Sequence, residues 1–352
     1  MNFRLFFFSA SVATALVAST ATLNAQVSSA ASSPKVKPGV SAPSPTPVVK
    51  PTPPTIKEED EVIKIDTELV NLNIRVIDRN NRTINNLQQK DFKIFEDGNL
   101  QQIDFFSTSE VPMNYALVVD NSGSIAPQLE KVIEAGRIFI DSNRPKDETM
   151  VVRFIGRDKI EILEPFTSNR TNLIDSLDQF YRESGQSAII DAVYLAVEHL
   201  DSSRQAKGSD DKARRAIILV TDGEEKDSFY KEKQLFDLLR ESDVQIYVIG
   251  FVGELSKEGG FISKSPQAKA KLLLERMAGE SGGKAYFPAS AAELPALARE
   301  ISSELRTQYS IGYIPSNDKR DGTYRNIKVS VADGPKSEKR IAITRAGRTA
   351  EK

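Results

Sequence analysis

The residues with the clearest chemical potential lie in the segment Asp120-Asn121-Ser122-Gly123-Ser124. One carboxylate and two hydroxyls alternate there, directly after the apolar residues 115–119. A short apolar run of this kind is typical of a buried strand. The carboxyl ends of parallel strands are where open α/β sheets place their ligands. Because hard divalent cations prefer oxygen ligands, the segment predicts part of an all-oxygen cation site.

Three side chains are too few for such a cation, which takes about six to eight oxygen ligands. Two other loops are expected at the same edge of the sheet. One covers residues 185–191 and opens a helix, and it offers Ser187. The other covers residues 221–224 and offers Asp222, which follows an apolar run much as Asp120 does. The candidate metal ligands are therefore Asp120, Ser122, Ser124, Ser187 and Asp222.

Strands and helices alternate across residues 113–306, which would position these loops. Apolar runs predict strands at residues 115–120, 150–155, 159–166, 216–220, 244–251 and 285–287. Apolar residues at helical spacing predict helices within residues 129–140, 173–180, 190–200, 235–239, 272–277 and 294–305. This alternation predicts an α/β fold, with a doubly wound, mostly parallel sheet and helices on both faces.

Segments of β character flank this unit, at residues 61–112 and 307–346. In the first, residues 70–76 alternate apolar and polar, and residues 92–95 and 100–106 flank Asp97-Gly98, a hairpin turn signal. In the second, residues 308–314, 327–332 and 340–344 alternate in the same way. Each flank is too small to bury a comfortable core alone. We therefore expect the flanks to join in one small β-sandwich, with residues 347–352 as a tail.

The central unit resembles a von Willebrand factor type A domain that carries a metal-ion-dependent adhesion site. The Asp-x-Ser-x-Ser loop of that family matches Asp120, Ser122 and Ser124, and the aspartate of its third loop matches Asp222. The threonine of its second loop falls on Ser187, which keeps the hydroxyl but lacks the methyl group that stiffens the rotamer. The flanks resemble a bacterial exported subfamily, through residues 90–98 and 308–313.

The resemblance implies a Rossmann-like domain that binds Mg²⁺, with Mn²⁺ or Ca²⁺ as alternatives. Ser122, Ser124 and Ser187 would coordinate the cation directly, while Asp120 and Asp222 would bind it or orient water. One coordination position would take an Asp or Glu carboxylate from a partner protein. The implied function is adhesion or protein–protein interaction, without enzymatic activity.

Composition excludes several other classes of site. The chain has no cysteine, which excludes disulfides, zinc-thiolate sites, iron–sulfur clusters and cysteine nucleophiles. It has one histidine, which excludes metal sites that need several. The formal net charge of −2 argues against a general nucleic-acid binder, which needs a basic face.

The first residues indicate export. Residues 1–25 combine Arg4, an apolar segment and small residues through Ala25, the order of a secretory signal peptide. The alternative is an uncleaved membrane anchor, for which the apolar segment is short. Residues 26–60 are rich in Pro and Ser and predict a disordered linker. No later segment is long and apolar enough to span a membrane, so we expect a periplasmic, secreted or cell-envelope protein.

Two other functions compete with adhesion. The first is a structural envelope protein whose domain needs no metal. The second is a Mg²⁺-dependent hydrolase. A serine hydrolase needs a histidine beside its nucleophile, yet His199 falls within a predicted helix. Haloacid dehalogenase-like phosphatases carry a second aspartate two residues after the first, where this chain has Ser122. We therefore predict that the protein is not an enzyme.

Overall fold

A six-stranded sheet forms the centre of the computed structural model, which describes residues 69–108, 111–181, 183, 185–207, 213–258 and 264–350. The spatial order is β10 (Lys284–Tyr286), β9 (Gln245–Gly250), β8 (Arg214–Thr221), β5 (Met113–Asp120), β6 (Glu148–Phe154) and β7 (Ile160–Thr167). Neighbouring strands are parallel, except β6 and β7, which are antiparallel. The predicted mostly parallel sheet is confirmed, whereas the predicted signal peptide and linker lie outside the described residues.

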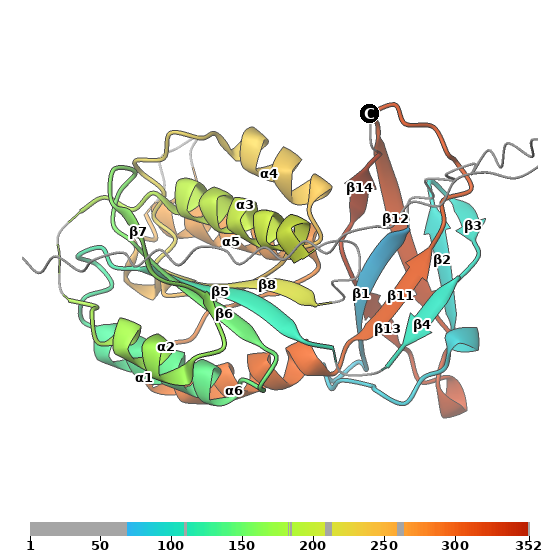
Figure 1. The fold of residues 1–352 in the computed structure, drawn as a ribbon, viewed down its shortest axis with the longest axis horizontal. Helices are drawn as coiled ribbons and strands as arrows, with labels where there is room; N and C mark the ends of the chain where they lie inside the picture. The colour runs from blue at the N-terminus through green and yellow to red at the C-terminus, as the bar shows by residue number, and fades with distance from the viewer. Residues whose placement is uncertain are drawn as a thin grey trace, which may run out of the picture. The chain divides into compact units, whose positions relative to one another are not determined.

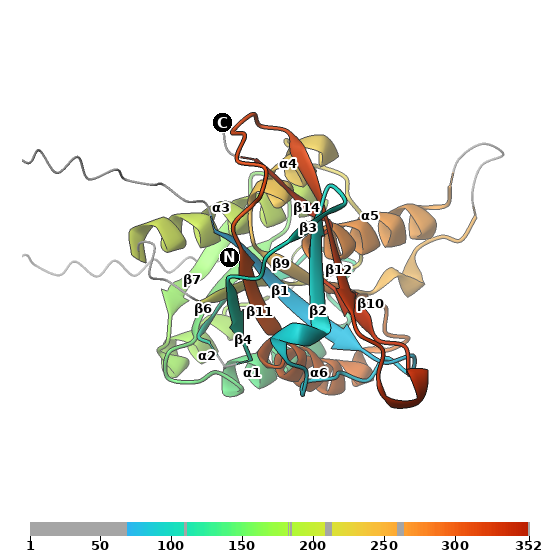
Figure 2. The same ribbon diagram turned by 90° about the vertical axis from the view of Figure 1, so that its right-hand side faces the viewer.

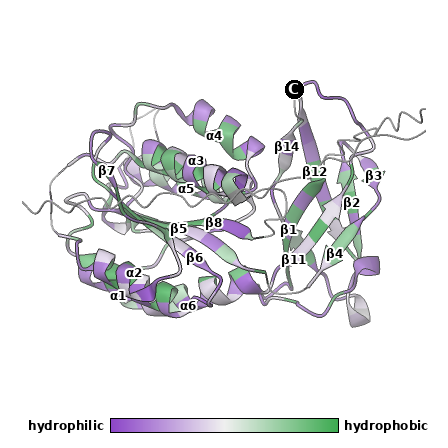
Figure 3. Cartoon of the chain, in the orientation of Figure 1, coloured by the Kyte–Doolittle hydropathy of each residue, from purple (hydrophilic) through white to green (hydrophobic). Residues whose placement is uncertain are grey.

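Helices cover both faces of this sheet because its inner strands are apolar on both sides. In β5, Ala116 and Val118 pack in one core with α3 (Ile189–Lys207), α4 (Glu232–Glu241) and α5 (Pro266–Ser281). The alternate residues Leu117 and Val119 pack in a second core with α1 (Leu129–Asp141), α2 (Arg170–Leu177) and α6 (Leu294–Arg306). Figure 1 shows the two helical layers, and Figure 3 shows hydrophobic residues along the strands between them. The doubly wound prediction is confirmed.

The order of the strands creates a switch point beside β5. The chain leaves β5 and forms β6 on one side, and it later returns to form β8 on the other side. At such a point the connections diverge to opposite faces and leave a crevice at the carboxyl ends of the strands. Asp120 ends β5, and Thr221 ends β8. The predicted cation site therefore falls where this fold leaves room for a ligand.

The two flanks combine into a pair of four-stranded antiparallel sheets within the described residues. One sheet has the order β13 (Ile341–Ile343), β1 (Val70–Ile77), β11 (Tyr309–Tyr313) and β4 (Phe105–Ser107). The other has the order β14 (Gly347–Thr349), β12 (Tyr324–Val331), β2 (Phe92–Glu96) and β3 (Asn99–Gln101). Buried residues of both flanks, including Ile74, Ile94 and Tyr309, form one core between the sheets. The flanks thus join as expected (Figure 2).

The structure corrects the predicted flanks at two places. Residues 100–106 are not one strand, because β3 pairs with β2 and β4 pairs with β11 of the other sheet. The chain crosses between the sheets at residues 102–104, where Asp104 N–H donates to the carbonyl oxygen of Gly312 at 2.9 Å. The predicted tail at residues 347–352 contains β14, which pairs with β12. The expected turn at Asp97-Gly98 is present, with φ values of 48° and 82°.

Four short 3₁₀ helices complete the described elements, at Gln89–Asp91, Val252–Glu254, Ala291–Glu293 and Pro335–Ser337. No helix in the described part of the chain has the length and apolar character needed to cross a membrane.

A buried carboxylate joins the β-sandwich to the α/β domain. Glu304 of α6 forms an ion pair with Arg75 of β1, with 2.7 Å between Oε1 and Nη1, and both side chains are buried. The hydroxyls of Tyr247 and Tyr286 donate to the same carboxylate at 3.2 and 3.3 Å. Burial and the charge of Glu304 raise the pKa of both tyrosines, so they remain protonated donors. The end of α6 is therefore held by both parts of the protein.

Replacing Arg75 with methionine should lower the free energy of unfolding by about 3 kcal/mol, because the buried Glu304 carboxylate loses its nearest cation. Adding Glu304→Gln to that variant should recover part of the loss, because the buried charge is then gone. Urea unfolding of the wild type and the two variants measures both effects. If the free energy of unfolding of the Arg75→Met variant lies within about 0.5 kcal/mol of the wild-type value, the prediction is contradicted.

Candidate metal centre

The first loop of the candidate site is organised by the Asp120 carboxylate. Its Oδ1 accepts a hydrogen bond from the Ser122 backbone N–H at 2.9 Å, which turns the chain sharply after β5. The Oγ atoms of Ser122 and Ser124 are 3.0 Å apart. Asp120 and Ser122 are buried, while Gly123 and Ser124 are exposed. The side-chain oxygen atoms of the loop therefore extend from the buried end of β5 to the solvent-exposed Ser124.

The second loop reaches the same carboxylate. Ser187, which lies just before α3, donates from Oγ to Asp120 Oδ2 at 2.9 Å. Gly185 makes this approach possible, because a Cβ atom there would lie 2.0 Å from Ile155 Cγ2. The hydroxyl of Ser187 therefore lies beside Asp120, and its role as a metal ligand stays a prediction.

The sequence reasoning missed one residue of this network, Thr221. Its Oγ1 donates to Asp120 Oδ2 at 2.7 Å and accepts from the Gly223 N–H at 3.0 Å. The parallel register pairs Val119 with Val220, so Asp120 and Thr221 come next on neighbouring strands. The signal was a hydroxyl one position before Asp222, at the end of an apolar run. Only the strand pairing shows that the Thr221 hydroxyl faces Asp120.

The third loop places Asp222 beside this network with one oxygen unused. Asp222 Oδ1 accepts from the Glu224 N–H at 2.9 Å. Asp222 Oδ2 is buried and has no hydrogen-bond partner among the described residues. Gly223 allows the turn that follows, because its φ of +84° lies in the left-handed region. A buried carboxylate oxygen without a donor is costly, and a cation would satisfy it.

Electrostatics leads to the same conclusion. Burial, followed by the negative charge of Asp222, raises the pKa of Asp120 to about 6. The hydroxyls of Thr221 and Ser122 and the Ser122 N–H oppose this rise by donating to the carboxylate. Two carboxylates that repel one another in a buried position fit a divalent cation, which would favour the charged form of both.

The donor set is formed of oxygen atoms only. The described residues contain no group of three or more His, Cys, Asp or Glu side chains that could hold a metal ion. The oxygen atoms gathered here are those of two carboxylates and of the hydroxyls of the three candidate serines, with the Thr221 hydroxyl beside them. The structure links Asp120, Ser122, Ser124 and Ser187 by hydrogen bonds, and it couples Asp222 to Asp120 through charge. Such a set suits Mg²⁺, Mn²⁺ or Ca²⁺ rather than a soft metal.

Two further carboxylates clamp the third loop onto the start of α3. Asp191 accepts from the backbone N–H groups of Phe229 and Tyr230 at 2.7 and 2.9 Å. In the opposite direction, Glu225 of the loop accepts from the Ile190 N–H at 3.0 Å, where it satisfies a free donor of the first helical turn. Because Ser187 precedes α3 and Asp222 begins the loop, this clamp sets the spacing between them.

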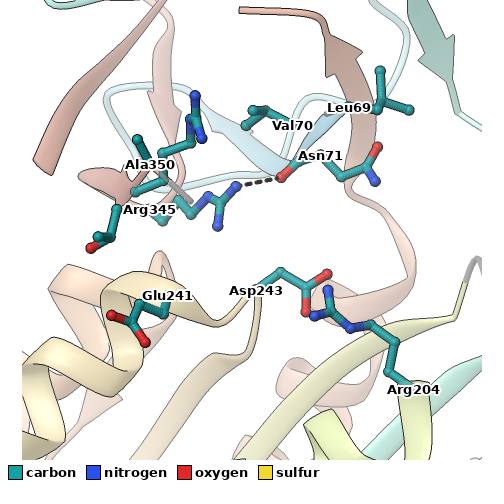
Figure 4. A pocket seen from close by; sticks show the side chains of 10 residues that line it. Leu69, Val70, Asn71, Arg204, Glu241, Asp243, Arg345 and Ala350 are labelled. Carbon is teal, nitrogen blue, oxygen red and sulfur yellow. Dashed lines mark hydrogen bonds between the residues drawn. The ribbon is translucent and has the colours of Figure 1, made fainter. Parts of the chain in front are cut away.

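A cavity of about 580 Å³ lies at the opposite end of the α/β domain, between α3, α4 and the β-sandwich (Figure 4). Several of its charged groups already contact protein atoms. Arg345 donates to the carbonyl oxygens of Ser242 and Asn71 at 3.3 and 3.1 Å. Asp243 is paired with Arg215 at 3.0 Å. None of the candidate metal ligands lines this cavity, and its contacts are those of a polar junction.

Fold and site together define an α/β domain with a cluster of oxygen-bearing side chains, a candidate cation site, at its switch point. The chain belongs to the von Willebrand factor type A domain family, whose model matches residues 114–300. The predicted family is therefore confirmed. The family consists of protein-interaction modules.

Individual relatives match parts of the chain. The human inter-alpha-trypsin inhibitor heavy chain H4 is 25% identical over 229 residues, which are 62% of this chain and 23% of that protein. An uncharacterized protein of Synechocystis sp. is 33% identical over 115 residues, 32% of this chain and 26% of its own length. The chain thus spans about a quarter of each relative. A solved von Willebrand factor type A structure from Catenulispora acidiphila is 12% identical, with a TM-score of 0.44, covering 74% of this chain and 75% of its own.

In the metal-free protein, Asp120→Asn should raise the free energy of unfolding at pH 7.5 and have little effect at pH 4. The pKa of Asp120 in the folded protein, about 6, lies above the ordinary value of 3.8. The folded state therefore binds more protons between these values, and stability falls as the pH rises through them. The gain at pH 7.5 is at most about 3 kcal/mol. Denaturant unfolding in chelator, with Asp237→Asn on α4 as control, measures it. A less stable Asp120→Asn variant at pH 7.5 would contradict the prediction.

Asp191→Ala should free the loop of residues 224–230, because two backbone N–H groups lose their acceptor. We expect a loss of about 2 kcal/mol in stability and faster hydrogen exchange at Phe229 and Tyr230. Asp201→Ala, farther along α3, is the matched control. Unchanged exchange at both amides would show that the clamp does not hold the loop.

Proposed function

We propose that this protein is an exported protein–protein interaction or adhesion module that binds a carboxylate of its partner through a divalent cation. Asp120, Ser122, Ser124, Ser187 and Asp222 would hold the cation, with Mg²⁺ as the first choice. The observation that carries the proposal is the buried Oδ2 of Asp222, which has no described donor. The negative charge of Asp222 also contributes to the raised pKa of Asp120. The family is consistent with it, because its members are interaction modules.

The composition of the site favours binding of a carboxylate. Three of the five candidate ligands are neutral hydroxyls, so a bound divalent cation would keep much of its attraction for a further anion. Ser124 is exposed, which leaves one side of the site open to a partner. An Asp or Glu side chain of another protein supplies the oxygen and the charge that this side lacks.

We propose binding rather than catalysis for the same site. The sole histidine, His199, lies ten residues after the start of α3 at Ile189. At the helical rise this places it about 15 Å along the helix from the end that carries Ser187. It cannot act as a general base on a hydroxyl of the site at that distance. The site hydroxyls of Ser187 and Thr221 instead donate to Asp120.

Export is part of the proposal and rests on the order of charged, apolar and small residues in residues 1–25. The mature protein would begin at Gln26, with the linker of residues 26–60 before the folded part. A periplasmic, secreted or envelope location suits a linker of this composition, which would hold the interaction domain away from its attachment.

Magnesium should stabilise the full mature chain, because binding to the folded state alone raises the melting temperature. At pH 7.5, a Mg²⁺ concentration about 100-fold above the dissociation constant adds about 2.7 kcal/mol. Asp222→Ala should abolish this stabilisation, whereas Asp237→Ala on the exposed side of α4 should leave it unchanged. At pH 5 the effect should shrink, since protons compete for Asp120. Thermal unfolding with and without chelator tests this, and an unchanged melting temperature would refute metal binding.

Partner capture tests the function itself. Envelope extract passed over the immobilised mature chain should yield a protein that chelator releases and that Asp222→Ala fails to retain. A partner retained equally with chelator and by Asp222→Ala would support a structural envelope protein with a metal-independent domain. Turnover of phosphate or peptide esters that requires Mg²⁺ would support a hydrolase instead.

A further inference from the structure

Three large apolar or aromatic side chains of the α/β domain are well exposed among its described residues: Tyr181, Phe229 and Leu272, at 47%, 69% and 49%. Tyr181 and Phe229 are attached to the loops of the candidate metal site. Leu272 lies on α5. Ala270 of the same helix faces Gly223 of the third loop, and Leu272 is two residues and about 200° around the helix from Ala270, so it lies on the opposite side of α5. Exposed aromatic residues at a binding edge are frequent anchors of protein interfaces.

Tyr181 is held by the first metal loop. Asn121, which lies between Asp120 and Ser122, donates from Nδ2 to the Tyr181 carbonyl oxygen at 2.7 Å. The guanidinium of Arg153 lies 4.5 Å from the centre of the tyrosine ring, a cation–π contact. Arg153 is itself fixed, because its Nη1 donates to the Gln179 carbonyl oxygen at 2.7 Å. The ring is therefore positioned before any partner arrives.

Phe229 is held by the third loop and the start of α3. Its N–H donates to Asp191, four residues after Ser187. Its ring meets that of Tyr230 edge-on, with centroids 5.5 Å apart, and Tyr230 stacks on Tyr194 at 3.9 Å. These contacts restrict the exposed ring of Phe229 before a partner binds. The ring therefore loses less conformational freedom on binding, which lowers the free-energy cost of using it as an anchor.

Four pairs of opposite charge lie near these aromatics. The pairs are Arg157–Asp227 at 2.9 Å, Lys226–Glu224 at 2.6 Å, Lys159–Glu183 and Arg153–Glu161. Each cation in these pairs is matched by a carboxylate. A strongly acidic partner segment would gain little attraction from these pairs, because each cation in them is already matched by a carboxylate.

We propose that Tyr181 and Phe229 are apolar contact residues beside the metal site, and that the partner segment bound there carries a single carboxylate between apolar side chains. The inference rests on the proposed function, because the metal must first bind the carboxylate. The aromatics then select among carboxylates by the side chains on each side. The surface ion pairs beside the aromatics contribute little to this selection among carboxylates.

Three capped, labelled pentapeptides test the proposal with the full mature chain and saturating Mg²⁺: Gly-Leu-Asp-Leu-Gly, Gly-Gly-Asp-Gly-Gly and penta-aspartate. Fluorescence anisotropy gives each affinity, with chelator as the blank. The leucine-flanked peptide should bind about tenfold more tightly than the glycine-flanked one, as expected for about 1.4 kcal/mol of apolar contact. Tyr181→Ala and Phe229→Ala should each reduce this preference.

Leu100→Ala is the matched control, since Leu100 is exposed on β3 of the β-sandwich at 62%. It should keep the preference, and all variants should keep the stabilisation by Mg²⁺. Equal affinities for the leucine-flanked and glycine-flanked peptides, or tightest binding of penta-aspartate, would overturn this proposal alone. Absence of Mg²⁺-dependent binding of every peptide would instead refute the proposed function, and this inference with it.

Discussion

The buried carboxylate of Asp120 is the constraint on which the arrangement of the candidate site depends. It sits at the end of the central strand β5, without exposure to solvent, and a charge in such a position must be met by donors. The protein supplies a backbone N–H from the first loop, the hydroxyl of Ser187 from the second and the hydroxyl of Thr221 from β8. Three segments distant in sequence are thereby drawn to one point. The arrangement of the loops follows from satisfying this one group.

Asp222 is the residue that makes the site a candidate for cation binding. It adds a second negative charge close to the first, and the described side chains supply no cation to compensate it there. In a purely structural network this arrangement would be costly, because both the repulsion and the unused oxygen destabilise the fold. Binding sites commonly retain such local costs, since the ligand removes them. The clamp by Asp191 and Glu225 keeps the loop in place despite the repulsion.

Glu304 offers an instructive contrast at the other end of the domain. It too is a buried carboxylate, but Arg75 pairs with it and two tyrosine hydroxyls donate to it. The charge of Glu304 is compensated by the chain itself, so the group joins α6 to the β-sandwich and leaves nothing for a ligand. The difference between the two buried carboxylates lies in whether the protein supplies the cation. That difference separates a structural contact from a candidate binding site.

Much of this fold could be predicted from local patterns in the sequence. Continuous apolar runs such as β5 and β8 indicate strands covered on both faces, and helical spacing indicates the layers above and below. The Asp-x-Ser-x-Ser segment and Asp222 were recognisable because each follows such a run. Local patterns could not separate β3 from β4, because alternation within residues 100–106 does not say which sheet a strand joins. They also gave no sign that β14 pairs with β12.

The sequence by itself determined the ligand types, the alternation of elements and the strand ends that carry the site. Only the tertiary structure decided that Thr221 donates to Asp120, that one oxygen of Asp222 has no described donor, and that Tyr181 and Phe229 are fixed beside the loops. The physical reason is that these facts depend on the register between β5 and β8 and on contacts between segments far apart in the chain. Residue type and spacing limit what a side chain can do, whereas its partners are set by the packing of the whole fold.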